Sequence, residues 1–94
     1  MAFHVLFTSK AKKQLAAIEK RQAKLIIGWI EKNLEGCMNP RGIEGSKQIK
    51  GSQNGWRYRV GSYRILASII DEDLIIEVVR VGHRQGVYEN LPKM

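Results

Sequence analysis

Residues 55–65 read Gly-Trp-Arg-Tyr-Arg-Val-Gly-Ser-Tyr-Arg-Ile, an alternating run that stops at a Gly-Ser pair and then resumes. A two-residue loop with glycine first is typical of the tight turns that join paired strands, so the stretch predicts a β-hairpin. In that hairpin Val60 faces Tyr63, and Arg59 lies directly opposite Arg64. We expect the fold to be built around this hairpin.

The two faces of the hairpin differ in chemistry because side chains alternate along a strand. One face is apolar and carries Trp56, Tyr58, Val60, Tyr63 and Ile65. The other carries Arg57, Arg59 and Arg64. Like charges opposite each other destabilise a sheet, and arginine does not relieve the repulsion by losing its proton. Any one of these arginines taken alone suits an ordinary solvated strand face. Together they indicate an anion, and guanidinium groups suit the phosphate of a phosphodiester.

The chain has 94 residues, 44% hydrophobic and 27% charged, which predicts one folded domain over residues 1–94. Its apolar runs are too short to span a bilayer and its start does not resemble a secretory signal, so we expect a soluble, cytoplasmic protein without a membrane partner. The lone Cys37 fits a reducing compartment. His4, His83 and Cys37 have no metal-ligand spacing, so we expect no metal and no cofactor.

The net charge of +7 is spread unevenly along the chain. Residues 41–64 carry six basic and one acidic side chain, whereas residues 65–79 carry four acids and no base. Such asymmetry indicates a polyanionic partner, either a nucleic acid or an acidic protein segment.

The first third of the chain predicts a strand and two helices. Residues 3–7 are β-prone, Thr8-Ser9 suits a helix cap, and Ala11, Leu15 and Ile18 have helical spacing. A second apolar face through Ala23, Ile27, Ile30 and Leu34 is rotated, which places a break near residues 20–22, although Gln22, Leu25 and Trp29 would continue the first face. Gly36 suits the end of the second helix.

Residues 37–54 carry the turn signals of a loop, in which residues 47–50 form a short extended piece whose lysines either reach a phosphate or face water. Two β-branched runs, 65–70 and 74–81, flank Asp71-Glu72-Asp73 and extend the hairpin to a three-stranded meander with residues 63–70 at its centre. A three-residue connection would put Arg80 opposite Arg64, and a two-residue one would shift that pairing.

The predicted fold class is α+β: one small domain in which an N-terminal strand and a two-helix hairpin pack on one face of an antiparallel sheet. The expected core joins the sheet residues Trp56, Tyr58, Val60, Ile65 and Ile69 to the helix residues Leu15, Ile18, Ile27 and Ile30.

Residues 82–89, Gly-His-Arg-Gln-Gly-Val-Tyr-Glu, bring His83, Arg84 and Tyr88 close together after the last strand. A histidine transfers protons near neutral pH, while an arginine only donates hydrogen bonds or stabilises charge. For each residue alone, an ordinary surface position is the alternative.

The spaced motifs WRYRVGSYRI at residues 56–65 and VGHR leading to Val87-Tyr88 resemble the RelE/ParE superfamily of bacterial and archaeal toxins. The resemblance covers nearly the whole chain and implies a toxin of a type II toxin–antitoxin system. Its RelE branch implies ribosome-dependent cleavage of mRNA in the ribosomal A site, without metal, by attack of the ribose 2'-OH on the adjacent phosphate.

Carried over by motif position, Arg57, Arg59 and Arg64 hold the scissile phosphate. Lys50, from the loop before the hairpin and not from the motif, is a further candidate phosphate ligand. Arg84 stabilises the phosphorane or the leaving oxygen alongside Arg64, and Tyr88 stacks on or orients the base. Well-known relatives have lysines where Arg57 and Arg59 stand; an arginine, with a pKa above about 12, does not act as a base. His83 and Tyr88 remain as candidates for the general base.

The resemblance also implies partners: a small antitoxin with an acidic segment, the ribosome with its mRNA, and operator DNA only through the antitoxin. Two alternatives stay open. The ParE branch poisons DNA gyrase and typically lacks the C-terminal pair that Arg84 and Tyr88 supply here, and an inactive member would act only as a binding module or co-repressor.

Overall fold

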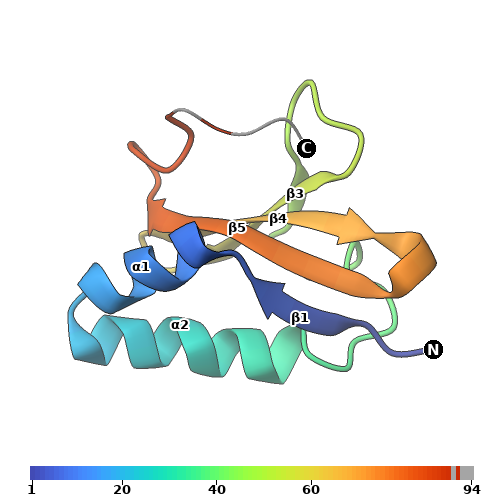
Figure 1. Ribbon diagram of the computed structural model, residues 1–94, viewed down its shortest axis with the longest axis horizontal. Helices are drawn as coiled ribbons and strands as arrows, with labels where there is room; N and C mark the ends of the chain where they lie inside the picture. The colour runs from blue at the N-terminus through green and yellow to red at the C-terminus, as the bar shows by residue number, and fades with distance from the viewer. Residues whose placement is uncertain (90, 92–94) are drawn as a thin grey trace.

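The computed structural model describes residues 1–89 and 91, in which two helices lie on one side of a five-stranded sheet (Figure 1). The strands are β1 (His4–Phe7), β2 (Lys47–Gln48), β3 (Gly55–Val60), β4 (Tyr63–Ile70) and β5 (Ile75–His83). The helices are α1 (Ser9–Ala17) and α2 (Lys20–Asn33), and a 3₁₀ turn, η1, covers Asp71–Asp73. The α+β class is therefore confirmed.

The strand order is β1-β5-β4-β3-β2, so the predicted meander of β3, β4 and β5 forms the middle of the sheet. Its pairs are antiparallel, and β2 adds an antiparallel edge strand at residues 47–48. The strand β1 adds to β5 in parallel, because the chain returns through α1 and α2 before it enters the meander. The complete sheet is therefore mixed.

The hairpin of β3 and β4 has the predicted register. Val60 pairs with Tyr63 and Arg59 with Arg64, and Gly61 has a φ of 60°, which a glycine adopts without strain. Arg80 does not lie opposite Arg64, as a three-residue connection would have placed it, but pairs with Leu66, while Arg64 pairs with Gly82. The connection from Ile70 to Ile75 has four residues, and a β-bulge between Leu66 and Ala67 adds one more residue on β5, so both shift the pairing.

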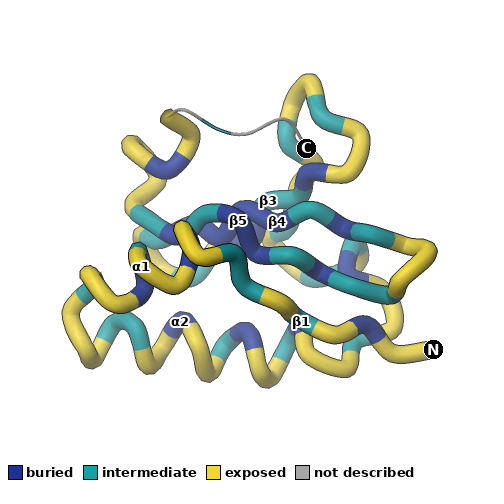
Figure 2. Tube along the Cα trace, in the orientation of Figure 1, coloured by how far each residue is buried: buried dark blue, intermediate teal, exposed yellow. Residues whose placement is uncertain are grey.

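The main core lies between the helices and the sheet, where the buried positions of β4 and β5 face those of the helices (Figure 2). Tyr58, Ile65 and Ile69 are buried as predicted, while Trp56 and Val60 are half-buried and pack against the same core. Leu15 and Ile30 join them from the helices, and Ile18 packs at the edge.

Within the described residues, neither helix is both long and apolar enough to cross a membrane.

The helices depart from prediction in two details. The break falls at Ile18 and Glu19, just before the predicted residues 20–22. The predicted cap is confirmed, since the Thr8 side chain accepts a hydrogen bond from the Ala11 backbone N–H at the start of α1. Ile27 is 37% exposed, and Ile26, at 1%, takes its place in the core. Ile26, Ile30 and Leu34 are spaced by four residues and form one stripe, so the prediction was wrong by one position.

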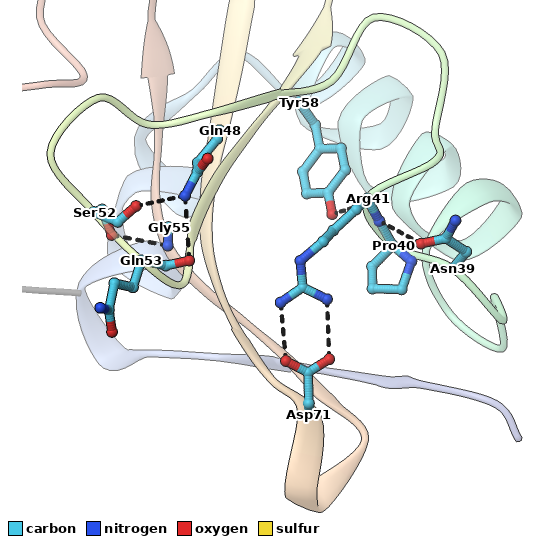
Figure 3. Close-up of polar contacts among 9 residues, drawn as sticks. All are labelled: Asn39, Pro40, Arg41, Gln48, Ser52, Gln53, Gly55, Tyr58 and Asp71. Carbon is cyan, nitrogen blue, oxygen red and sulfur yellow. Dashed lines mark hydrogen bonds and ion pairs between the residues drawn. The ribbon is translucent and has the colours of Figure 1, made fainter.

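A long connection between α2 and β2 makes three polar contacts, two of which hold it to β3 and η1 (Figure 3). The Tyr58 hydroxyl donates to the Pro40 carbonyl oxygen at 2.6 Å, and Arg41 forms a bidentate ion pair with Asp71 at 3.0 and 2.9 Å. The Arg41 backbone N–H also donates to the Asn39 side chain. Because the Tyr58 ring lies against Trp29 of α2, the connection is fastened on the helix-bearing side of β3.

Candidate functional site

The side of the sheet opposite the helices displays a cluster of cations, which we call the arginine face: Arg57 and Arg59 of β3, Arg64 of β4, and Arg84 after β5. Side chains of directly paired strand residues lie on the same face, so the pairing of Arg59 with Arg64 brings these two guanidinium groups together. Arg57 is two residues before Arg59 and faces the same way. The cluster predicted from strand alternation is present.

Arg64 is the centre of the cluster and is only 7% exposed. Its Nη1 donates to the carbonyl oxygens of Gly61 and Tyr63 at 3.1 and 3.0 Å, so the tight turn holds the guanidinium in place. Burial lowers the pKa of Arg64, as do the positive charges of Arg59, Arg57 and Arg84, while Tyr88 acts in the opposite sense. The geometry agrees with these influences: Arg59 pairs with Arg64 across the strands, the Arg84 backbone is bonded to the hairpin turn, and Arg57 and Tyr88 line one pocket.

The cluster carries uncompensated charge. Among residues 1–89 and 91, no carboxylate pairs with Arg57, Arg59, Arg64 or Arg84. Within the same residues, the Arg57 Nε is buried and has no hydrogen-bond acceptor. A buried donor without a partner is unfavourable, so an incoming anion would satisfy it.

A small second core forms the floor beneath these cations. Leu66 pairs with Arg57 on one side and with Arg80 on the other, is fully buried, and packs with Val79 and Val87. This floor was not predicted. Its signal was the unbroken apolar run Ile65-Leu66-Ala67, which is typical of a strand buried on both faces.

Val87 anchors the C-terminal turn that carries Arg84 and Tyr88. The backbone N–H groups of Gly86 and Val87 donate to the His83 carbonyl oxygen, and the Arg84 N–H donates to Ser62 in the hairpin turn at 3.3 Å. A side chain at position 82 would meet Val87, at 3.7 Å from an added Cβ. This is an ordinary van der Waals distance, so Val87 packs directly over position 82 and the turn lies close to the end of β5.

A pocket of about 400 Å³ opens beside the cluster. It is lined by Gln48, Ile49, Lys50, Arg57, Tyr88 and Leu91. Its outer wall is braced: the Gln48 side chain donates to the carbonyl oxygens of Ser52 and Gln53, and the Gly55 N–H donates to the Ser52 hydroxyl (Figure 3). The structure therefore brings Lys50 and Tyr88 to the same pocket as Arg57.

His83 lies apart from the other candidate residues. It pairs with Tyr63 and stacks on that ring at 4.4 Å between centroids, and Tyr63 packs against the main core. Strand alternation thus places His83 on the helix-bearing side of the sheet. Its neighbour Arg84 in the sequence is tied instead to the hairpin turn next to Arg64.

Residues 5–88 match the family described as the ParE toxin of type II toxin–antitoxin systems, parDE. The chain belongs to this family. It is also 33% identical over 95 residues to Toxin RelE3 of Methanocaldococcus jannaschii, an alignment that covers 94% of this chain and 98% of that one. Both branches of the RelE/ParE superfamily thus appear among its relatives, and the chain is a type II toxin of that superfamily.

Solved structures of RelE toxins have the same fold. The RelB–RelE antitoxin–toxin complex of Methanococcus jannaschii is 31% identical with a TM-score of 0.67, covering 93% of this chain and 99% of that one. A free E. coli RelE mutant has a TM-score of 0.71 at 24% identity, covering 88% and 84%. The RelBE2 complex of Mycobacterium tuberculosis has a TM-score of 0.72 at 24% identity, covering 89% and 100%.

Proposed function

We propose that this toxin is an endoribonuclease that acts in the cytoplasm and cleaves mRNA in the ribosomal A site, which stops translation. The observation that carries the proposal is the arginine face: four guanidinium groups beside Tyr88, unpaired with carboxylates in the described residues, with the central Arg64 held by two backbone carbonyl oxygens. Cleavage of a phosphodiester by the neighbouring 2'-OH develops negative charge on the phosphate oxygens, and preorganised donors stabilise that charge.

In this mechanism the 2'-oxygen attacks phosphorus and the bond to the 5'-oxygen breaks. The proton of the 2'-OH goes to a base, and the leaving oxygen takes up a proton. Arg57, Arg59 and Lys50 bind the phosphate, and Arg64 and Arg84 stabilise the phosphorane and the leaving oxygen. Tyr88 orients the nucleobase of the substrate. Of the two candidates for the general base, Tyr88 is also the better placed, because His83 lies on the other side of the sheet.

The four arginines stay protonated at neutral pH, so none of them serves as the base. Orientation of the 2'-OH for in-line attack then becomes a large part of the catalysis, and fixed geometry contributes strongly to such reactions. The ribosome supplies that orientation in our proposal, without a metal ion. We therefore expect little cleavage of free RNA.

The test compares ribosome-bound and free message with the wild-type protein, Arg84→Ala and Arg41→Ala. Arg41→Ala is a matched control because it also removes one arginine side chain, but from the helix-bearing side of the molecule. We expect Arg84→Ala to lower the cleavage rate about 10²–10³-fold and Arg41→Ala to leave it nearly unchanged. Equal loss in both variants would remove Arg84 from the mechanism, and efficient cleavage of free RNA would remove the ribosome.

The same arginine face also suits the acidic segment of a cognate antitoxin, by charge complementarity. An antitoxin bound there would cover the cations that the reaction needs. Contact with operator DNA would then be made by the antitoxin part of the complex.

Binding to DNA gyrase is the second candidate, because the matching family is described by its ParE members. Arg84 and Tyr88 favour the nuclease, since their placement around Arg64 is not needed for a binding surface alone. Inducing the toxin while following both message cleavage and DNA supercoiling separates the two. Gyrase-dependent DNA breaks without message cleavage would favour gyrase, and neither effect would indicate an inactive binding module.

A further inference from the structure

The two helices carry a second set of basic residues, on the side of the sheet opposite the arginine face. We call it the helical patch, and it consists of Lys10, Lys12 and Lys13 of α1 and Lys20, Arg21 and Lys24 of α2. All six are exposed, and the stretch 9–24 has a single acidic residue, Glu19. No ion pair joins any of the six to a carboxylate within residues 1–89 and 91.

The α2 part of the patch works against helix stability. Lys20 and Arg21 occupy the first turn, where the helix dipole disfavours cations; that turn has no acidic residue and its N-cap makes no side-chain hydrogen bond. Lys24 is four residues from Lys20 and three from Arg21, so it lies next to both on the helix surface. Like charges at these spacings are also destabilising.

Gly28 continues the same stripe one turn after Lys24. It is exposed in the middle of α2, and an added Cβ would have no heavy atom within 4 Å. An exposed glycine inside a helix is unfavourable relative to alanine. No packing contact explains the glycine, and its effect is to leave the helix backbone open beside the three cations. Unfavourable dipole interactions, like-charge contacts and an uncovered backbone thus coincide on one surface.

We propose that the helical patch binds the phosphate backbone of folded RNA, as a second contact surface separate from the arginine face. Lysine is a compact, strongly hydrated point charge, which suits phosphate contacts that carry no sequence information. Lysines make up five of the six patch residues, whereas all four cations of the arginine face are arginines, with Arg64 held by the hairpin turn. The two surfaces therefore differ in chemistry as well as in place.

The sheet separates the two surfaces, and the shortest dimension of the molecule is 24 Å. A single strand that crosses the arginine face does not extend around the molecule to the helices. A folded RNA that encloses the protein presents phosphates on both sides at once. The inference rests on the proposed function, in which the enclosing RNA is that of the ribosome.

The test uses a matched pair of substitutions on one helix, Lys24→Gln and Lys32→Gln, both in an Arg84→Ala background that spares the RNA. Lys32 is exposed in the last turn of α2, two turns beyond Lys24 on the same stripe, so it carries an equal charge on the same face of the helix but away from the patch. The affinity for purified ribosomes is measured over a range of salt concentrations. We expect Lys24→Gln to reduce the slope of log K against log salt by roughly 0.7–0.9, and Lys32→Gln to leave the slope unchanged.

A triple variant, Lys20→Gln/Arg21→Gln/Lys24→Gln, extends the test. Its affinity for ribosomes should fall about 10–100-fold at physiological salt, while its affinity for a short single-stranded RNA stays within about twofold. Its melting temperature should be equal to or above that of the parent, because unfavourable cations leave the first turn.

Equal effects of Lys24→Gln and Lys32→Gln would show that ribosome binding depends only on the net charge of the protein and not on the position of the lysine, which would overturn the proposal. So would an equal loss of affinity for ribosomes and single-stranded RNA in the triple variant. Failure of the proposed function gives a different result: the protein with Arg84 intact would bind ribosomes through the patch and cleave no message. Normal cleavage with patch-independent ribosome binding would overturn the patch alone.

Discussion

The two faces of the β3–β4 hairpin use the same alternation for opposite purposes. The helix-bearing face buries Tyr58 and Ile65 in a core that extends across both helices and four strands. The arginine face sets Arg57, Arg59 and Arg64 over a smaller floor, whose buried apolar residues within the described part of the chain are Leu66, Val79 and Val87. One face therefore supplies most of the stability, and the other holds charges in positions that stability alone would not favour.

This difference between the two faces predicts which substitutions change stability and which change activity. A change on the helix-bearing face should alter the free energy of unfolding and leave the activity of each folded molecule intact. A change at the exposed cations Arg59 and Arg84 should alter activity and leave stability equal or improved, whereas the buried Arg64 also holds the hairpin turn. The floor residue Leu66 lies between the two regimes, since it is buried and also supports Arg57.

Tyr58→Ala should give the largest loss of stability. The ring is fully buried against Trp29, and its hydroxyl is bonded to the Pro40 carbonyl oxygen. Removing a buried aromatic side chain typically costs about 3–5 kcal/mol. Denaturant unfolding measures this loss, and cleavage normalised to the folded fraction should be unchanged; a fall in that normalised rate would break the separation of the two faces.

Leu66→Ala should have the next largest effect on stability, about 2–5 kcal/mol, because it leaves a cavity beneath the arginine face. Unlike Tyr58→Ala, it should also reduce cleavage by the folded fraction, since Arg57 loses its support. Ile69→Ala is the control: an equally buried position in the main core that should lower stability only. Identical activity in these two variants would show that the floor does not position the cations.

Tyr58 also gives an alkaline pH dependence of stability. Burial raises the pKa of Tyr58 above its usual value of about 10, so the folded protein keeps the phenol protonated while the unfolded chain ionises. Its contribution is complete below pH 10 and is lost as the pH rises above the unfolded pKa.

In Tyr58→Phe the buried Pro40 carbonyl loses its donor, which should cost about 1–3 kcal/mol at pH 8. The difference in unfolding free energy between wild type and Tyr58→Phe should then narrow by about 1.4 kcal/mol between pH 8 and pH 11. If the difference in unfolding free energy between wild type and Tyr58→Phe did not change with pH, burial of the Tyr58 phenol would not be the cause of an alkaline loss of stability.

The sequence predicted the hairpin and its two faces well because each rests on a local rule. Strand alternation and the Gly-Ser turn are enough to define the register that pairs Arg59 with Arg64. The parallel pairing of β1 with β5 was not predictable in this way, since it joins segments about 70 residues apart and has no local signal.

Two features, one in the core and one near the site, show where local patterns are ambiguous. Leu25, Ile26 and Ile27 are consecutive and apolar, so the periodicity admits neighbouring helical phases and only packing selects Ile26. His83 and Arg84 are adjacent in the sequence, which suggested one shared site. Alternation extended from Val81, which is in the main core, would have placed His83 beside Tyr63.

Arg59→Gln tests the contrast between the two faces most directly, with unfolding and cleavage of ribosome-bound message measured on the same preparation. Arg59 is exposed and directly opposite Arg64, so removing its charge relieves repulsion worth about 0.2–1 kcal/mol and takes away one phosphate ligand. We predict equal or higher stability together with a cleavage rate lowered about a hundredfold. Lower stability with unchanged cleavage would contradict the account.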